Sequence, residues 1–291
     1  MSRRLLWTVS LLGLAAAAPA QAVAANDLKT DPTKEFLLEP WIKIPKLGPI
    51  DLSITKGVFY LLLTTVILIL STLLIARNLK LNPKRLQAVV EILYDFSESQ
   101  IGRLSLPAKT YATWFPYVAT LFLFILVNNL ISYLPLPVDT EHKIFGVIPT
   151  PTFYAATSNL SVTLALTLVT FFASHYVGIR HNGAVPYFKS WVPPVSGAIK
   201  LLIVPLEVLS QFLRIVSLSV RLFANMLAGH LLILMGISLI VIIGHAWVAA
   251  AGIPVAVFFW CFEFVLIAGL QAFIFALLSG IYIGTAAEPY H

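Results

Sequence analysis

The sequence predicts an all-α integral membrane protein with about five transmembrane helices after removal of a signal sequence. Of the 291 residues, 59% are hydrophobic and only 11% are charged, a balance that is not typical of soluble globular domains. Apolar segments of about 20 residues, the length that spans a hydrocarbon core of about 30 Å, recur along the chain. Basic residues gather beside alternate segments, as in multi-pass membrane proteins. We also expect a surface amphipathic helix and, near the C-terminus, an antiparallel hairpin of two long tilted helices.

The N-terminal region resembles a cleavable secretory signal. Residues 1–25 begin with Arg3 and Arg4, continue with a short apolar stretch and end in small residues. The apolar stretch is too short to span a bilayer. We therefore assign 1–25 to a signal sequence, 26–56 to an extracytoplasmic segment and 57–291 to the membrane domain. Such a signal favours a bacterial plasma (inner) membrane, with the N-terminus outside the cytoplasm.

The first span is predicted at residues 57–76, and four basic residues follow it within ten positions. This end is expected in the cytoplasm, because connections rich in Lys and Arg stay inside. Residues 86–104 place apolar side chains near helical spacing against three acidic ones. That pattern predicts an amphipathic helix that lies along the membrane surface or against a partner.

A second span, residues 115–134, ends at a Pro-Leu-Pro stretch and leads into a loop with Asp139 and Glu141. The third span, residues 160–179, returns to basic residues. The two connections predicted inside hold nine Lys and Arg, whereas the loop predicted outside holds one, Lys143. The nine are Arg77, Lys80, Lys84, Arg85, Arg103, Lys109, Arg180, Lys189 and Lys200. Two further spans place the C-terminus in the cytoplasm.

One arginine stands out in the next span, which is predicted at residues 206–243. At about 38 residues, this helix must tilt or begin outside the hydrocarbon region. Arg221 is the only charged residue in the 48 positions between Arg214 and Glu263. An arginine near the bilayer midplane costs roughly 2.5 to 3.5 kcal/mol on insertion scales. The alternative is an arginine that snorkels from a helix end, but apolar stretches flank Arg221 on both sides, so it is the leading functional residue.

At about 100° per residue, a polar stripe runs along this helix. Its members are Ser210, Arg214, Ser217, Arg221 and Asn225, with Glu207 at the cytoplasmic end. A polar stripe toward lipid is expensive, so we expect it to face protein or water. Glu207 and Arg214 have the alternative of snorkelling to the interface, whereas Arg221 and Asn225 do not.

His230 lies nine residues after Arg221, about half a turn away around the helix, so the two side chains serve different surfaces. We predict that Arg221 presents a fixed cation, while His230 lines a separate aqueous route, because histidine exchanges protons near neutral pH. A neutral histidine satisfied by a neighbouring helix is the alternative.

The final helix, predicted at residues 255–283, carries Glu263 and Gln271 among apolar neighbours. A buried carboxyl that can bind and release a proton is what a proton relay needs. If the last two helices are antiparallel, Gln271 approaches the level of Arg221 and Glu263 that of His230. This follows because Glu263 and Gln271 are eight residues apart on one helix, and Arg221 and His230 are nine residues apart on the other.

Other chemistry is not indicated. Cys261 is the only cysteine, so no intramolecular disulfide forms, and its apolar setting suits a small buried hydrophobe better than a metal or redox site. His245 is interpreted as an interfacial residue near the outer turn. The net charge of +6 comes from basic residues beside apolar segments, which topology explains without nucleic acid. We expect no cofactor and, without a phosphate loop, no catalytic site in this chain.

Two segments of the last third resemble signatures of subunit a of the F-type ATP synthase, the stator component beside the rotating ring. SLSVRLFANMLAGH, residues 217–230, is similar to the signature around the essential arginine, and LQAFIF, residues 270–275, is similar to the second signature. Weaker similarity at residues 129–135 and 161–166 extends the resemblance to roughly residues 86–283.

The resemblance implies an ion-translocating core at residues 200–284 with two offset proton half-channels that open toward the rotating c-ring. Arg221 then meets the ring carboxylates and prevents a proton short-circuit. Asn225 and Gln271 are its polar neighbours, and Glu207 and Ser217 lie on the cytoplasmic route. The implied partners are the c-ring, subunit b of the peripheral stalk, the lipid bilayer and protons; the sequence leaves sodium open as the ion.

Three positions depart from the pattern that the resemblance implies. His230 stands where many relatives have glutamate. Its natural partner, Glu263, lies eight residues before Gln271, where seven are expected. Asn159 stands where many relatives carry aspartate in the outer access path.

Two other classes of protein stay open. A secondary transporter could use Arg221 to bind an anionic solute, but such proteins show inverted repeats with broken helices, and residues 57–180 hold no counterpart of the Arg221 helix. A subunit that only anchors others in the membrane leaves the cost of Arg221 unexplained.

Overall fold

The fold is known from a computed structural model of the chain. It describes residues 40–42, 53–77, 79, 85–134, 136–137, 143–144, 148–149, 151–152, 154–191 and 199–288. The predicted signal sequence, residues 1–25, lies outside the described residues, as does most of the predicted extracytoplasmic segment.

The described part of the chain is an all-α membrane fold, as predicted, with five helical segments long and apolar enough to cross a membrane. These segments are α2 (Lys56–Arg77), α5 (Ala108–Ile131), α6 (Leu160–Asn182), α8 (Ile199–Ile243) and the run of α9 (Ala246–Phe262), the π-helical turn η5 (Glu263–Ile267) and α10 (Ala268–Ala287). Each of these helical segments contains one of the predicted apolar stretches. A stretch of this kind forms a helix because a helix satisfies its own backbone polar groups within lipid.

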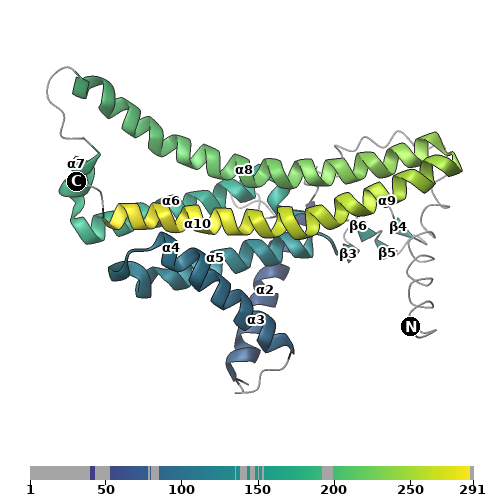
Figure 1. Cartoon of the computed structure of the whole chain (residues 1–291), viewed down its shortest axis with the longest axis horizontal. Coiled ribbons are helices and arrows are strands. Elements are labelled where there is room, and N and C mark those ends of the chain that lie inside the picture. Colours follow the sequence, from purple (N-terminus) through teal and green to yellow (C-terminus); the bar gives the residue numbers. More distant parts are fainter. Residues whose placement is uncertain are drawn as a thin grey trace.

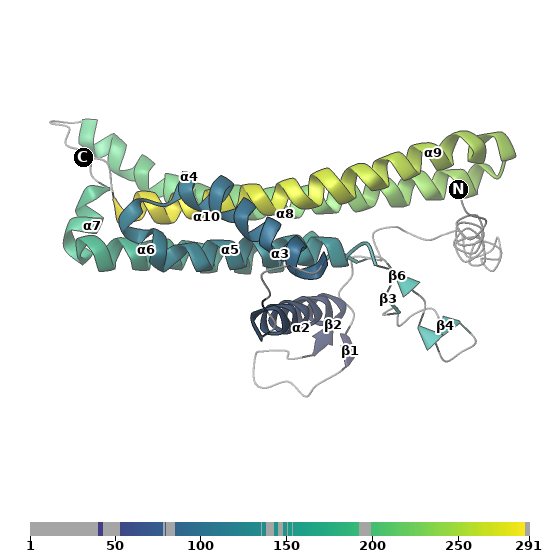
Figure 2. The same ribbon diagram turned by 60° about the horizontal axis from the view of Figure 1, so that its bottom comes forward.

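The predicted antiparallel hairpin is formed by α8 and the α9–α10 run, which lie side by side from the turn onward, while the first part of α8 diverges from α10 (Figure 1). Gly244 and His245 make the turn, and Gly244 adopts a positive φ of 63°, a conformation that favours glycine. The α9 end projects beyond α5 and α6 in both views (Figure 2). The α5 and α6 helices lie along the α10 half of the hairpin.

Both hairpin helices begin earlier than predicted. The α8 helix starts at Ile199 rather than 206, and α9 starts at Ala246 rather than 255. Pro205 and Pro254 lie inside these helices, since membrane helices tolerate proline. At about 1.5 Å per residue, 45 residues of α8 extend over roughly 68 Å, about twice a hydrocarbon core.

The predicted surface helix consists of α3 (Arg85–Phe96), a π-helical turn η3 (Ser97–Gly102) and the short α4 (Arg103–Ser105). It exposes Val89 and Ile92 on one side. Its buried side places Ile101 in the hydrophobic core with α5 and α10.

Smaller elements lie between the spans and were not predicted. They are the helix α7 (Ala184–Ser190), the 3-10 turn η4 (Ala156–Ser158), and the antiparallel strand pairs β1 (Pro40–Ile42) with β2 (Ile54–Thr55), β3 (Leu136–Pro137) with β6 (Pro151–Thr152), and β4 (Lys143–Ile144) with β5 (Ile148–Pro149). Each strand has only two or three residues, so the fold class is unchanged.

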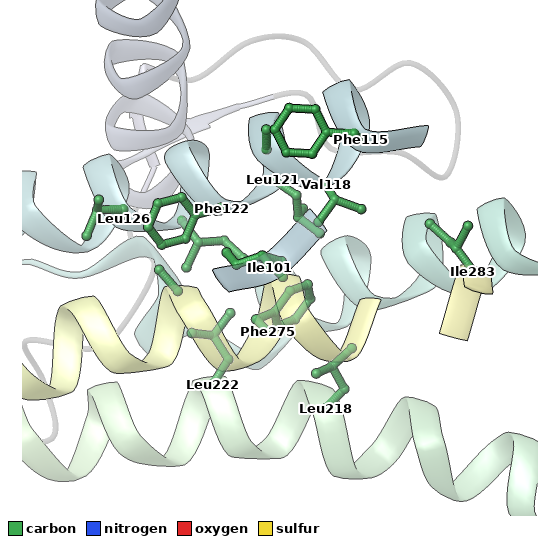
Figure 3. Packing of buried hydrophobic residues seen from close by; sticks show 14 of the residues in the cluster. Ile101, Phe115, Val118, Leu121, Phe122, Leu126, Leu218, Leu222, Phe275 and Ile283 are labelled. Atoms are coloured by element: carbon green, nitrogen blue, oxygen red, sulfur yellow. The ribbon is translucent and has the colours of Figure 1, made fainter. Parts of the chain in front are cut away.

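The main core lies where α5, α8 and α10 meet. Phe122 of α5 and Ile101 lie close to Phe275 of α10, and Leu218 and Leu222 point from α8 toward the same helix (Figure 3). All five side chains are buried. This packing fixes the helix faces on which the polar residues of the hairpin lie.

Candidate functional site

Arg221 is half-buried on α8, and its guanidinium Nη2 donates to the hydroxyl of Ser217, one turn away, over 3.3 Å. Within the described residues Arg221 forms no ion pair; the ion pair found there joins Arg103 to Glu98. An unpaired cation inside a spanning helix is costly. The fixed charge of Arg221 is therefore available to a group from outside this chain.

Asn225, one turn after Arg221, joins the two helices of the hairpin. Its Nδ2 donates to Oε1 of Gln271 on α10 over 2.8 Å. Gln271 is buried, and its own Nε2 has no partner within the described residues. Gln271 thus lies one turn from Arg221, close to the level that antiparallel packing predicts.

His230 and Glu263 are both buried, at 6% and 2% exposure, on the facing sides of α8 and η5. The Glu263 carboxyl lies against Gly229, where a Cβ would overlap it. His230 lies against the ring of Tyr133, with ring centroids 5.6 Å apart. We refer to His230, Glu263 and Tyr133 as the His230 cluster. It matches the predicted approach of Glu263 to the level of His230.

Four polar atoms of the His230 cluster are buried without a hydrogen bond of good geometry within the described residues, although the Tyr133 hydroxyl and the Glu263 carboxyl lie close enough to interact. These atoms are His230 Nε2, both carboxyl oxygens of Glu263 and the Tyr133 hydroxyl. A buried polar group without a partner costs about 1 to 3 kcal/mol. Such groups are usually satisfied by water, which a polar site accommodates. The cluster therefore has buried donors and acceptors that are available to water or to an exchanging proton.

The π-helical turn explains the spacing of eight residues between Glu263 and Gln271. In a regular α-helix, eight residues place the second side chain about 80° from the first, whereas seven place it about 20° away. A π turn accommodates one extra residue, and η5 begins at Glu263 itself. Both side chains consequently face α8 and are buried. The unexpected spacing is thus compensated by the backbone.

We expect deletion of Val265, an exposed residue of η5, to be tolerated. The shortened segment can form a regular α-helix in which seven residues separate Glu263 from Gln271 at nearly the same angle. ATP-driven proton pumping by membrane vesicles should stay close to that of the unchanged chain.

Deletion of Ile274 in α10 is the matched control, because it turns Glu263 and Gln271 together by about 100° away from α8 and should abolish pumping. Equal loss in both deletions would show that η5 does not compensate the spacing.

An apolar layer occupies the α8–α10 interface between Arg214 and Gln271. Its side chains, all at most 1% exposed, are Leu218, Leu222, Met226, Ala272 and Phe275. Leu218 and Leu222 lie between α8 and α10, and Phe275 of α10 lies beside Ile101 (Figure 3). Close packing of these apolar side chains leaves no room for water among them.

A cavity of about 120 Å³ lies at the Glu207 end of α8, on the side of the apolar layer opposite the His230 cluster. Gln211 donates to the Glu207 carboxylate over 3.1 Å. The Arg214 guanidinium lies 5.2 Å from the centre of the Tyr282 ring, a cation–π contact. All four residues line this cavity, which has room for several waters. We refer to it as the Glu207 cavity.

A smaller cavity of about 20 Å³ continues from the Glu207 cavity, sharing Gln211, Arg214 and Tyr282 with it. Threonines of α6 line its far side, and it ends at Leu218 of the apolar layer. The cavities at this end of the hairpin therefore end at Leu218, about one turn before Arg221.

Three residues from the sequence analysis lie elsewhere. Asn159 caps α6, because its Oδ1 accepts from the backbone N–H of Ser161 over 2.8 Å. The prediction that Cys261 is buried is wrong: Cys261 is exposed on the surface of α9, where lipid can cover an apolar side chain. His245 is exposed at the hairpin turn, away from the His230 cluster.

Sequence analysis missed two aromatic residues of the site, Tyr133 and Tyr282. Both lie among apolar residues, where a tyrosine resembles an ordinary core or interfacial side chain. The available signal for Tyr133 was its hydroxyl at the end of a span, next to the Pro-Leu-Pro stretch.

These features define a class: a multi-pass membrane protein whose last hairpin carries ionisable side chains on both sides of an apolar layer. The chain matches the family described as ATP synthase A chain over residues 58–284. It belongs to this family, as the resemblance predicted, and is a non-catalytic, membrane-sector subunit.

Individual members of the family are similar in sequence to this chain along nearly its whole length. The chain is 37% identical to the ATP synthase subunit a of Rubrobacter xylanophilus over 266 residues, which cover 89% of this chain and 95% of that protein. It is also 37% identical to the subunit a of Bradyrhizobium diazoefficiens over 272 residues, 91% of this chain and 100% of that protein.

Proposed function

We propose that this chain is the ion-translocating stator subunit of an F-type ATP synthase and provides two offset proton half-channels to the rotating c-ring. The observation that carries the proposal is the apolar layer, with the Glu207 cavity on one side and the His230 cluster on the other. Two polar regions that do not meet inside the subunit can pass protons only by way of a moving carrier.

Arg221 is proposed to face the carboxylates of the ring. It has no ion pair within the described residues, so a ring carboxylate can supply the missing negative charge. Arginine is effectively always protonated in proteins. It therefore attracts a deprotonated carboxylate but does not pass a proton from one half-channel to the other. Ser217 and the Asn225–Gln271 pair hold the polar surface around it.

The His230 cluster is proposed as the outer half-channel, and Glu207 with Arg214 as the inner one. His230 and Glu263 can each bind and release a proton, which suits uptake from the outer side. A ring carboxyl that has received this proton is neutral and can rotate through lipid. Glu207, beside a cavity of about 120 Å³, is placed to receive the proton on release. The ion is proposed to be the proton; Asn159 remains a weaker candidate for the outer path.

The proposed topology places the N-terminus outside the cytoplasm and the C-terminus inside, in a bacterial plasma membrane. Residues 1–25 are proposed to be a cleaved signal, 26–56 the extracytoplasmic segment and 57–291 the membrane domain with its core at 200–284. Apolar side chains of α2, such as Leu70 and Leu74, are exposed. We assign their covering to the bilayer and to subunit b of the peripheral stalk.

The function is tested by ATP hydrolysis in vesicles that contain the purified complex. Hydrolysis should acidify the vesicle interior in a buffer without sodium. Uptake of sodium without acidification would assign sodium as the ion, and hydrolysis that moves neither ion would refute the proposed function.

We expect His230→Ala to slow passive proton conduction through the membrane sector by roughly tenfold or more, because it removes a proton-exchanging group from the outer route. Conduction is measured in vesicles stripped of the catalytic sector. His245→Ala, at the exposed hairpin turn, is the matched control and should leave conduction unchanged. Equal rates for the two variants would remove His230 from the path.

A further inference from the structure

Tyr133 is a buried residue to which the proposed function gives no task. It follows the end of α5, at 5% exposure. Its ring contacts three side chains of the hairpin: His230, Trp260 and Phe264, with centroid distances of 5.6, 6.1 and 5.4 Å. The phenol is thus held between α8 and the α9–η5 segment.

The hydroxyl of Tyr133 has no role in packing. It makes no hydrogen bond of good geometry within the described residues, although a buried tyrosine hydroxyl usually finds a partner; the Glu263 carboxyl lies close enough to interact with it. A phenylalanine would make the same ring contacts without leaving a polar atom unsatisfied. The hydroxyl therefore adds a cost that packing does not explain.

The surroundings of the hydroxyl contain two groups that exchange protons. Glu263 lies within electrostatic reach of it, and the His230 ring lies beside the Tyr133 ring at an angle of 30°. Trp260 and Phe264 form apolar walls around the phenol. His230 Nε2 and the Glu263 oxygens also lack a hydrogen bond of good geometry within the described residues, so the three groups have donors and acceptors that can pair with one another or with a bridging water.

We propose that the Tyr133 hydroxyl carries protons between His230 and Glu263 in the outer half-channel, directly or through one water. The inference rests on the proposed function. A hydroxyl accepts through a lone pair while it donates its own hydrogen. A proton leaves the His230 nitrogen for the Tyr133 oxygen, and the original phenolic proton passes to the Glu263 carboxylate. The phenol ends neutral, as it began, and only N–H and O–H bonds change.

The test is Tyr133→Phe, which removes the hydroxyl and keeps the ring. Passive proton conduction is measured in vesicles stripped of the catalytic sector and is normalised to the amount of assembled complex. We expect a decrease of roughly five- to tenfold, because proton transfer by a positioned side chain contributes at least this much. Unchanged conduction in Tyr133→Phe would overturn the inference.

Tyr111→Phe is the matched control. Tyr111 is on α5, near the end of the helix that is far from Tyr133, and its hydroxyl is likewise buried without a hydrogen bond of good geometry within the described residues. Conduction should be unchanged in this variant. An equal decrease in both variants would mean that losing a buried hydroxyl perturbs the fold, which would also overturn the inference.

Tyr133→His separates proton transfer from packing, because imidazole restores an exchangeable proton on an aromatic ring. It should conduct faster than Tyr133→Phe, and failure to do so counts against the inference even if Tyr133→Phe assembles poorly. The proposed function has its own readout, since loss of coupling in Arg221→Ala does not depend on Tyr133.

Discussion

Arg221→Ala should abolish ATP-driven acidification of vesicles and permit a passive proton leak. Arg221 is the only charged residue in 48 positions, and it forms no ion pair within the described residues. Under the proposed function, its loss removes the cation that holds a deprotonated ring carboxylate and blocks proton passage between the two routes at the ring surface. Both effects are measured by the quenching of a pH-sensitive dye, with and without ATP.

Arg214→Ala is the informative comparison. Arg214 is a cation on the same helix, two turns away, but its guanidinium already lies against the Tyr282 ring beside the Glu207 cavity. Its loss should slow pumping without a leak. Normal pumping by Arg221→Ala, or a leak of the same size from Arg214→Ala, contradicts the role given to Arg221.

Glu263→Gln should reduce proton conduction through the membrane sector by roughly 100-fold or more, the contribution typical of a positioned acid or base. The amide fits the space against Gly229 that the carboxyl occupies, so packing is preserved while proton exchange is lost. The rate is measured as passive conduction in stripped vesicles. Glu263→Asp, which keeps a shorter carboxyl, should retain part of the activity.

Glu288→Gln provides the control for this substitution. Glu288 is an exposed carboxyl immediately after α10, and its conversion should leave conduction unaltered. If Glu263→Gln conducts like Glu288→Gln, then Glu263 is a structural residue, and the outer half-channel must use other groups.

The membrane architecture could be predicted because hydrophobic length dominates in lipid. All five spans, the hairpin and the isolated Arg221 followed from apolar length and the rarity of charge. The helix ends were less predictable. Pro205 and Pro254 lie inside helices, which the sequence does not reveal, because neighbouring groups decide whether a membrane helix continues through proline.

The details of the site depended on backbone geometry that one sequence does not express. The spacing of Glu263 and Gln271 looked irregular until η5 accounted for the extra residue. Asn159 serves as a helix cap, a role that sequence analysis had not considered. Tyr133 meets His230 only because the end of α5 folds against the hairpin, about 100 positions away in the chain.

The central claim, that an apolar layer separates two aqueous routes, is tested most directly by the accessibility of single cysteines to a water-soluble thiol reagent. Cys261, the only native cysteine, is first replaced by serine. Cysteine is then introduced at one position at a time: Leu222, which lies in the layer, or Gln211 or His230, which lie on its two sides. Gln211→Cys should react only from the cytoplasmic side, His230→Cys only from the outer side, and Leu222→Cys from neither. Reaction of Leu222→Cys from both sides would contradict the account.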